Sequence, residues 1–199
     1  EMMISHSISV RQGVSKSLLV VDMPFNTYNN PSQALKNCKK VMKLTKCDAV
    51  KIEGGLKIVN IVKYLTKNKI PVMGHLGILP QSTKGKFKSK GKSIKEKKQL
   101  IRDCKILEEA GVFSIVLECI ERKLAKKITN LINIPTIGIG SSNNCDGQIL
   151  VIDDVLGLTN SQMKFVKKFV DVKKLVNYGA KKFKIEVRSK KFPSKKYSY

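Results

Sequence analysis

The chain has 199 residues, 42% of them hydrophobic, which is enough to bury one sizeable core and excludes a disordered linker or tail. Apolar runs such as 18–21 are far shorter than the roughly 20 residues that span a membrane, and the N-terminus lacks the order of a secretory signal, so we expect a cytoplasmic protein. The net charge of +24 could indicate nucleic-acid binding, but 35 of the 39 basic residues are lysines, which favours a solvated lysine-rich surface over a polyanion-binding face.

Residues 1–13 have apolar side chains at partly helical spacing and are expected to form a crossover helix whose preceding strand is absent. Beyond them, short apolar runs alternate with longer amphipathic stretches, which is typical of strands and crossover helices around a parallel sheet. The expected strands are 17–22, 48–52, 71–75, 113–118, 135–140 and 148–152. The expected helices are 31–46, 56–68, 94–110, 122–131 and 162–187, the last with a possible break near Gly179.

Six parallel strands are fewer than the eight that close a barrel of alternating strands and helices. We therefore expect an α/β fold of the (β/α)8 TIM-barrel type in which about six of the eight βα units are present and the first two are absent. Residues 1–199 are expected to form this single incomplete domain, with 188–199 as a surface tail.

The cysteines argue against a disulfide framework, because they are odd in number and no two form a C-x-x-C pair. The same spacing argues against a structural zinc site. We expect reduced thiols, most of them in the core, at Cys38, Cys47, Cys104, Cys119 and Cys145.

Polar side chains end four of the predicted strands: Asp22, Glu53, His75 and Glu118. Each has an ordinary structural explanation, such as capping a turn or, for Glu53, pairing with Lys51. The carboxyl ends of the strands in such a barrel converge on one mouth, however, and acids there are costly unless they bind a metal or move protons. Together they predict an active site at that mouth.

The segment 83–93 is a loop of lysine, glycine and serine with one aromatic residue, Phe87. Its composition fits a flexible solvated excursion or an active-site lid, and the sequence does not choose between them.

An ordered series of motifs runs along the chain: VVDMPF, KIEGG, PVMGHLGILPQS, EEAGVFSIVLE, IPTIGIG, CDGQILVIDDVLGL and a closing FPSKKYSY. With these motifs the chain resembles the ketopantoate hydroxymethyltransferase family over nearly its whole length. The resemblance implies transfer of a hydroxymethyl group from 5,10-methylenetetrahydrofolate to 3-methyl-2-oxobutanoate, giving 2-dehydropantoate on the route to pantothenate and coenzyme A. It also implies a homo-oligomer, commonly a decamer.

The resemblance assigns roles to the strand-end residues. Asp22 and Glu53 correspond to Mg²⁺ ligands, Asp22, Lys51 and His75 to substrate-binding residues, and Glu118 to the catalytic base. The magnesium ion would stabilise an enolate formed by removing the proton on carbon 3 of the 2-oxo acid, since it acts as a Lewis acid.

The sequence departs from the family pattern at several points. The glycine-aspartate-serine motif that supplies another magnesium ligand is missing, Ser141-Ser142 replace alanine and glycine, and the 83–93 loop is shorter and richer in lysine. Either the 199 residues are part of a longer active enzyme, which we favour, or they are a complete truncated product. Three function classes remain: the transferase, an inactive barrel homologue and a basic polyanion-binding protein that reuses the fold.

Overall fold

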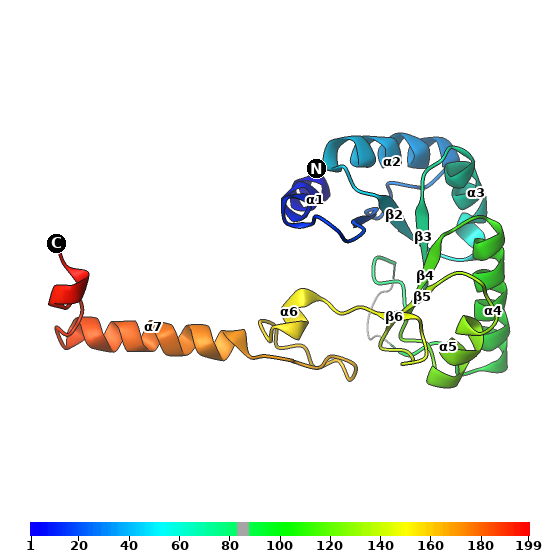
Figure 1. Ribbon diagram of the computed structural model, residues 1–199. Helices are drawn as coiled ribbons and strands as arrows, with labels where there is room; N and C mark the ends of the chain where they lie inside the picture. Colours follow the sequence, from blue (N-terminus) through cyan, green and yellow to red (C-terminus); the bar gives the residue numbers. More distant parts are fainter. Residues whose placement is uncertain (83–87) are drawn as a thin grey trace. The chain divides into compact units, whose positions relative to one another are not determined.

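The computed structural model describes residues 1–82 and 88–199, and within them the chain divides into two compact units, Glu1–Ile149 and Leu150–Tyr199. Unit 1 contains a curled parallel sheet and the helices that cover it (Figure 1). Unit 2 contains the remaining helices. The prediction of one incomplete domain over the whole chain stays a prediction.

A six-stranded sheet in the order β1-β2-β3-β4-β5-β6 forms the centre of unit 1, and each pair of neighbouring strands is parallel. This arrangement confirms the predicted partial barrel with six βα-type strands. The strands are β1 (Val20–Asp22), β2 (Ala49–Glu53), β3 (Val72–Gly77), β4 (Ser114–Glu118), β5 (Thr136–Ile139) and β6 (Gly147–Gln148).

The helices between the strands lie along one face of this sheet (Figure 1). Asn30 caps α2 by accepting a hydrogen bond from the Gln33 backbone N–H, and Ser93 caps α4 in the same way for Glu96, which confirms the expected helix start at Ser93. The helices of unit 1 are α1 (Met2–Gly13), α2 (Pro31–Thr45), the 3₁₀ turn η1 (Leu56–Ile58), α3 (Val59–Lys67), α4 (Ile94–Glu109) and α5 (Arg122–Thr129).

The two faces of the sheet are buried to different extents. Val21 and Ile52 point toward the helices and are 2% and 0% exposed. On the opposite, inner face Val20, Met73 and Ile137 are half-buried, whereas Ala49 and Val116 are buried. A parallel sheet in a closed barrel is buried on both faces. The half-buried positions therefore identify the inner face as the lining of an open barrel.

The prediction of a strand over residues 148–152 was partly wrong. The strand ends at Gln148, and Ile152 instead begins the short helix α6 (Ile152–Val155). Val151 and Ile152 are more than half exposed, and β6 pairs with β5 alone among the described residues. An apolar run forms a strand only where partners cover it, so this segment does not continue the sheet.

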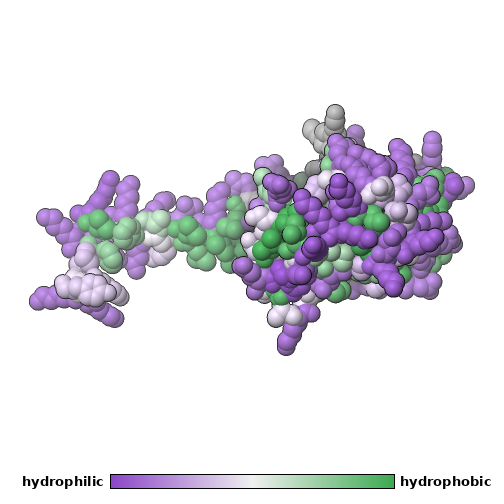
Figure 2. All heavy atoms as spheres, turned by 90° about the horizontal axis from the view of Figure 1, so that it is seen from above, coloured by the Kyte–Doolittle hydropathy of each residue, from purple (hydrophilic) through white to green (hydrophobic). Residues whose placement is uncertain are grey.

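Unit 2 carries the long helix α7 (Val172–Arg188) and the 3₁₀ turn η2 (Lys195–Tyr197). The helix begins ten residues later than expected, because the Asp171 carboxylate caps it by accepting from the Lys174 backbone N–H. It also continues unbroken through Gly179, which helices tolerate at a cost of about 1 kcal/mol. A band of apolar surface runs along α7 (Figure 2), and residues 188–199 are exposed.

All five cysteines are free thiols and buried, as expected. Burial raises the pKa of Cys38 and of Cys104 to about 12, so both remain protonated at neutral pH. Residues 83–87, part of the 83–93 segment predicted as a flexible loop or a lid, lie outside the described residues. No helix in the part of the chain that the structure describes is long and apolar enough to cross a membrane.

Asp103 on α4 holds the turn that follows β2. Its buried carboxylate accepts hydrogen bonds from the Leu56 backbone N–H, at 3.1 Å, and from Gln99 Nε2, at 2.8 Å. A methyl group on Gly55 would overlap this carboxylate, which explains the glycine in the turn. The contact fixes the end of β2 against α4.

We predict that Asp103→Ala lowers the free energy of unfolding by about 1 to 3 kcal/mol, because the buried Leu56 N–H loses its acceptor. Urea denaturation followed by circular dichroism measures this change. Asp103→Asn keeps the acceptor oxygen and Glu109→Ala removes an exposed acid from the same helix, so both should remain close to the parent. Equal stability of Asp103→Ala and Glu109→Ala would contradict the proposed anchor.

Candidate active site

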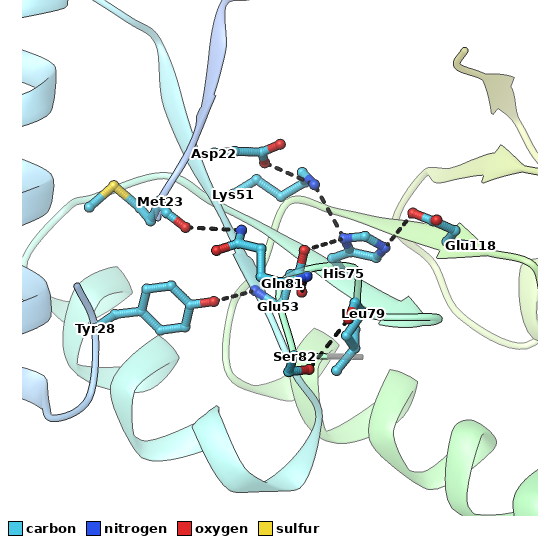
Figure 3. A network of polar contacts seen from close by, with 10 residues as sticks. All are labelled: Asp22, Met23, Tyr28, Lys51, Glu53, His75, Leu79, Gln81, Ser82 and Glu118. Atoms are coloured by element: carbon cyan, nitrogen blue, oxygen red, sulfur yellow. Dashed lines mark hydrogen bonds and ion pairs between the residues drawn. The ribbon is translucent and has the colours of Figure 1, made fainter. Parts of the chain in front are cut away.

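The structure brings all five residues that the sequence singled out to one end of the inner face. Strand register pairs Asp22 with Lys51 and Glu53 with His75, while Glu118 ends the next strand. Side chains two residues apart on a strand share a face, so these side chains point the same way. Figure 3 shows them as one connected network.

Lys51 connects the first two strands of this network with the third. Its Nζ lies 2.8 Å from Asp22 Oδ1 and 3.2 Å from His75 Nδ1. The Lys51 side chain is largely buried, whereas that of Asp22 is 44% exposed. The ammonium group is therefore held below a carboxylate that solvent and ligands can reach.

His75 is the most buried member, with its side chain 2% exposed. An ammonium group can only donate, so the Lys51 contact makes Nδ1 the acceptor and assigns the proton to Nε2. Nε2 lies 3.2 Å from Glu118 Oε2, yet the geometry is too poor for a hydrogen bond, and this buried nitrogen has no hydrogen-bond partner among the described residues. It is a buried donor that lies beside the Glu118 carboxylate.

Glu53 is held by the loops around it. Its Oε2 accepts a hydrogen bond from the Gln81 backbone N–H at 3.2 Å, and its Oε1 lies 3.7 Å from His75 Nδ1. Burial raises the pKa of Glu53 above its ordinary value, and repulsion from Asp22 adds to the shift although His75, Gln81 and Lys51 oppose it. A cation bound beside Glu53 would therefore stabilise the charged form of its carboxyl group.

Two members of the network were missed by the sequence predictions. The Tyr28 hydroxyl accepts from the Glu53 backbone N–H at 3.4 Å, and Gln81 Nε2 donates to the Met23 carbonyl at 3.2 Å (Figure 3). Burial raises the pKa of Tyr28, so its hydroxyl stays protonated. The available signal was their position, because both stand in loops that directly follow strands with polar ends.

Gly77 allows the last residues of β3 and β4 to approach closely. It has a φ of 103°, and a Cβ at this position would overlap the Glu118 carbonyl oxygen. That carbonyl accepts from the Ile78 backbone N–H at 2.9 Å. The glycine therefore fixes the backbone from which the Glu118 side chain reaches His75.

The oxygen donors of Asp22 and Glu53 fit a magnesium ion in chemical type. Hard carboxylates on neighbouring strands repel each other here, and Mg²⁺ commonly binds one or two protein carboxylates while keeping water or substrate oxygens. No cluster of three or more His, Cys, Asp or Glu placed to hold a metal occurs within residues 1–82 and 88–199. Asp22 and Glu53 therefore fit an open magnesium site with two protein ligands.

Comparison with solved structures supports the barrel-type fold. Phosphonopyruvate hydrolase, in a structure described as a complex with oxalate and Mg²⁺, superposes with a TM-score of 0.52 at 12% identity, over 98% of this chain and 72% of that one. Identity this low shows a shared fold alone.

Sequence comparison identifies closer relatives. The 3-methyl-2-oxobutanoate hydroxymethyltransferase of Pelagibacter ubique is 59% identical over 199 residues, which are 100% of this chain and 77% of that protein. The enzyme of the same name from Chlorobaculum tepidum is 46% identical, over 99% of this chain and 74% of its own length. The profile of the ketopantoate hydroxymethyltransferase family matches residues 1–195. The chain therefore belongs to the ketopantoate hydroxymethyltransferase family.

Proposed function

We propose that the protein transfers a hydroxymethyl group from 5,10-methylenetetrahydrofolate to 3-methyl-2-oxobutanoate, giving 2-dehydropantoate. The observation that carries the proposal is the chain of contacts from Asp22 through Lys51 and His75 to Glu118, at the mouth of the open barrel. It combines a cation, a buried hydrogen-bond donor and a carboxylate base within reach of one small ligand. Relatives named for this reaction support the choice of substrate.

The 2-oxo acid would bind through Lys51 and His75. Its carboxylate carries a negative charge that the Lys51 ammonium can neutralise, and Lys51 already lies between Asp22 and His75. The unsatisfied Nε2–H of His75 would donate to a substrate oxygen, which removes the cost of a buried donor without a partner. These two contacts orient carbon 3 toward Glu118.

Asp22 and Glu53 would hold the magnesium ion. When bound, Mg²⁺ would supply a Lewis acid that withdraws charge from the keto oxygen. Asp22 would then exchange its contact with Lys51 for the metal and leave the ammonium group to the substrate. Glu53 would stay in place through Gln81 and the loop after β3.

Glu118 would act as the general base. Its carboxylate would take the proton from carbon 3, and the electron pair of the C–H bond would form the carbon–carbon double bond of an enolate. Carbon 3 would then attack the one-carbon unit of the donor, forming the new carbon–carbon bond as a carbon–nitrogen bond breaks. Water would displace the second nitrogen and supply the hydroxyl oxygen, and tetrahydrofolate would leave with the proton taken by Glu118 and one proton of the water on its two nitrogens.

We predict that the protein exchanges the hydrogen on carbon 3 of 3-methyl-2-oxobutanoate for deuterium in the presence of Mg²⁺ and without folate. Glu118→Gln should slow this exchange by about 10² to 10⁴-fold, the usual contribution of a general base. Proton NMR in D₂O follows the loss of the signal. Glu109→Gln, an exposed change on α4, is the matched control and should exchange at the parent rate.

Exchange by Glu118→Gln at the parent rate would remove Glu118 as the base. No exchange by a folded parent protein would remove the enzyme interpretation itself.

We also predict that Asp22→Asn and Glu53→Gln each weaken metal binding at least about tenfold. Residues that only hydrogen-bond to a metal ligand already contribute about 10 to 100-fold to metal affinity, and the loss of a ligand should cost at least as much. Titration with Mn²⁺ as a probe for Mg²⁺, followed by electron paramagnetic resonance of the free ion, measures this without any activity. Glu109→Gln is again the control. Parent-like Mn²⁺ affinity in both variants would place the metal elsewhere.

A further inference from the structure

A cavity of about 240 Å³ opens beside Glu53, outside the contacts assigned to the 2-oxo acid. Its walls come from the loop after β1, the segment from η1 into α3 and the loop after β3. Complete sites for drug-sized ligands measure about 300 to 1,000 Å³. The cavity therefore suits one ring system of a larger ligand, with the remainder in solvent.

One wall of this cavity is apolar and carries an exposed aromatic ring. Phe25 is 58% exposed although it lies next to the buried side chains of Ile58 and Ile61 in the lining. Within the described residues, Phe25 takes part in no aromatic pair. An exposed aromatic ring in the lining of a cavity is suited to stacking on a flat ligand.

The polar part of the lining offers both donors and acceptors. The Tyr28 hydroxyl accepts from the Glu53 backbone N–H and keeps its own hydrogen to donate, and Gln81 donates to the Met23 carbonyl while its carbonyl oxygen remains available. Asn26 and Asn29 add two amides. This lining matches a heterocycle with alternating N–H and carbonyl groups, and its two charged side chains, Glu53 and Lys57, have opposite signs.

We propose that this cavity binds the planar nitrogen heterocycle of the one-carbon donor, stacked on Phe25. The inference rests on the proposed function and deepens it by placing the second substrate. Because Glu53 lines the cavity and also lies 3.7 Å from His75, a donor seated here would present its one-carbon unit beside the enolate. The rest of the donor would extend past the rim toward solvent.

The test uses isothermal titration of the whole chain with tetrahydrofolate that lacks the one-carbon unit, under anaerobic conditions. Phe25→Ala should weaken binding about tenfold or more, the scale that stacked bases lose when an aromatic residue is removed. Phe25→Leu should also lose affinity, since it stays apolar but has no ring, whereas Phe25→Trp should retain it. Phe169→Ala, which removes another exposed phenylalanine, is the control and should bind like the parent.

Deuterium exchange on 3-methyl-2-oxobutanoate, measured in the same variants, separates this inference from the proposed function. Unchanged exchange together with weaker tetrahydrofolate binding in Phe25→Ala and Phe25→Leu supports the cavity assignment. Parent-like tetrahydrofolate affinity in both variants, with exchange intact, overturns the cavity assignment and leaves the proposed function standing. Absent exchange in the parent overturns the proposed function, whereas Phe25-dependent binding would still support the cavity.

Discussion

The register of the parallel sheet is the constraint on which the candidate site depends. Side chains on a strand alternate between two faces, so a shift of one residue would turn a whole strand over. The apolar residues that face the helices, such as Val50 and Ile115, are fully buried and hold each strand in its register. Core packing on the outer face therefore places Lys51 and Glu118 on the inner face.

The charges within the site are arranged differently from those of the protein surface. The chain as a whole carries a net charge of +24, yet the network combines the carboxyl groups of Asp22, Glu53 and Glu118 with the single ammonium group of Lys51. Burial raises the pKa of Glu53, so the folded protein disfavours its charged form. A divalent cation bound beside the carboxyl group would reverse that preference.

The sequence predicted the elements whose signals are local, and it was less accurate where tertiary contacts decide. Strand β4 and helix α4 follow from an apolar run and a capped amphipathic stretch, and both were predicted to within one residue. The segment after Gln148 was predicted wrongly because an apolar run does not reveal whether a neighbouring strand covers it. The polar strand ends indicated Asp22, Glu53, His75 and Glu118, and the family resemblance added Lys51. The contacts of Tyr28 with the Glu53 backbone N–H and of Gln81 with the Glu53 carboxylate could not be predicted, since both depend on loop conformation.

Gly55 and Asp103 are 48 positions apart in the sequence but share one small volume. Any side chain at position 55 would collide with the carboxylate, and a smaller residue at position 103 would leave a gap and an unpaired Leu56 N–H. A substitution at either position alone would destabilise the turn after β2, so substitutions that persist over evolution should occur at both positions together. A covarying pair in the family would thus record a contact on α4 that supports the turn after β2, although neither residue belongs to the network of the candidate site.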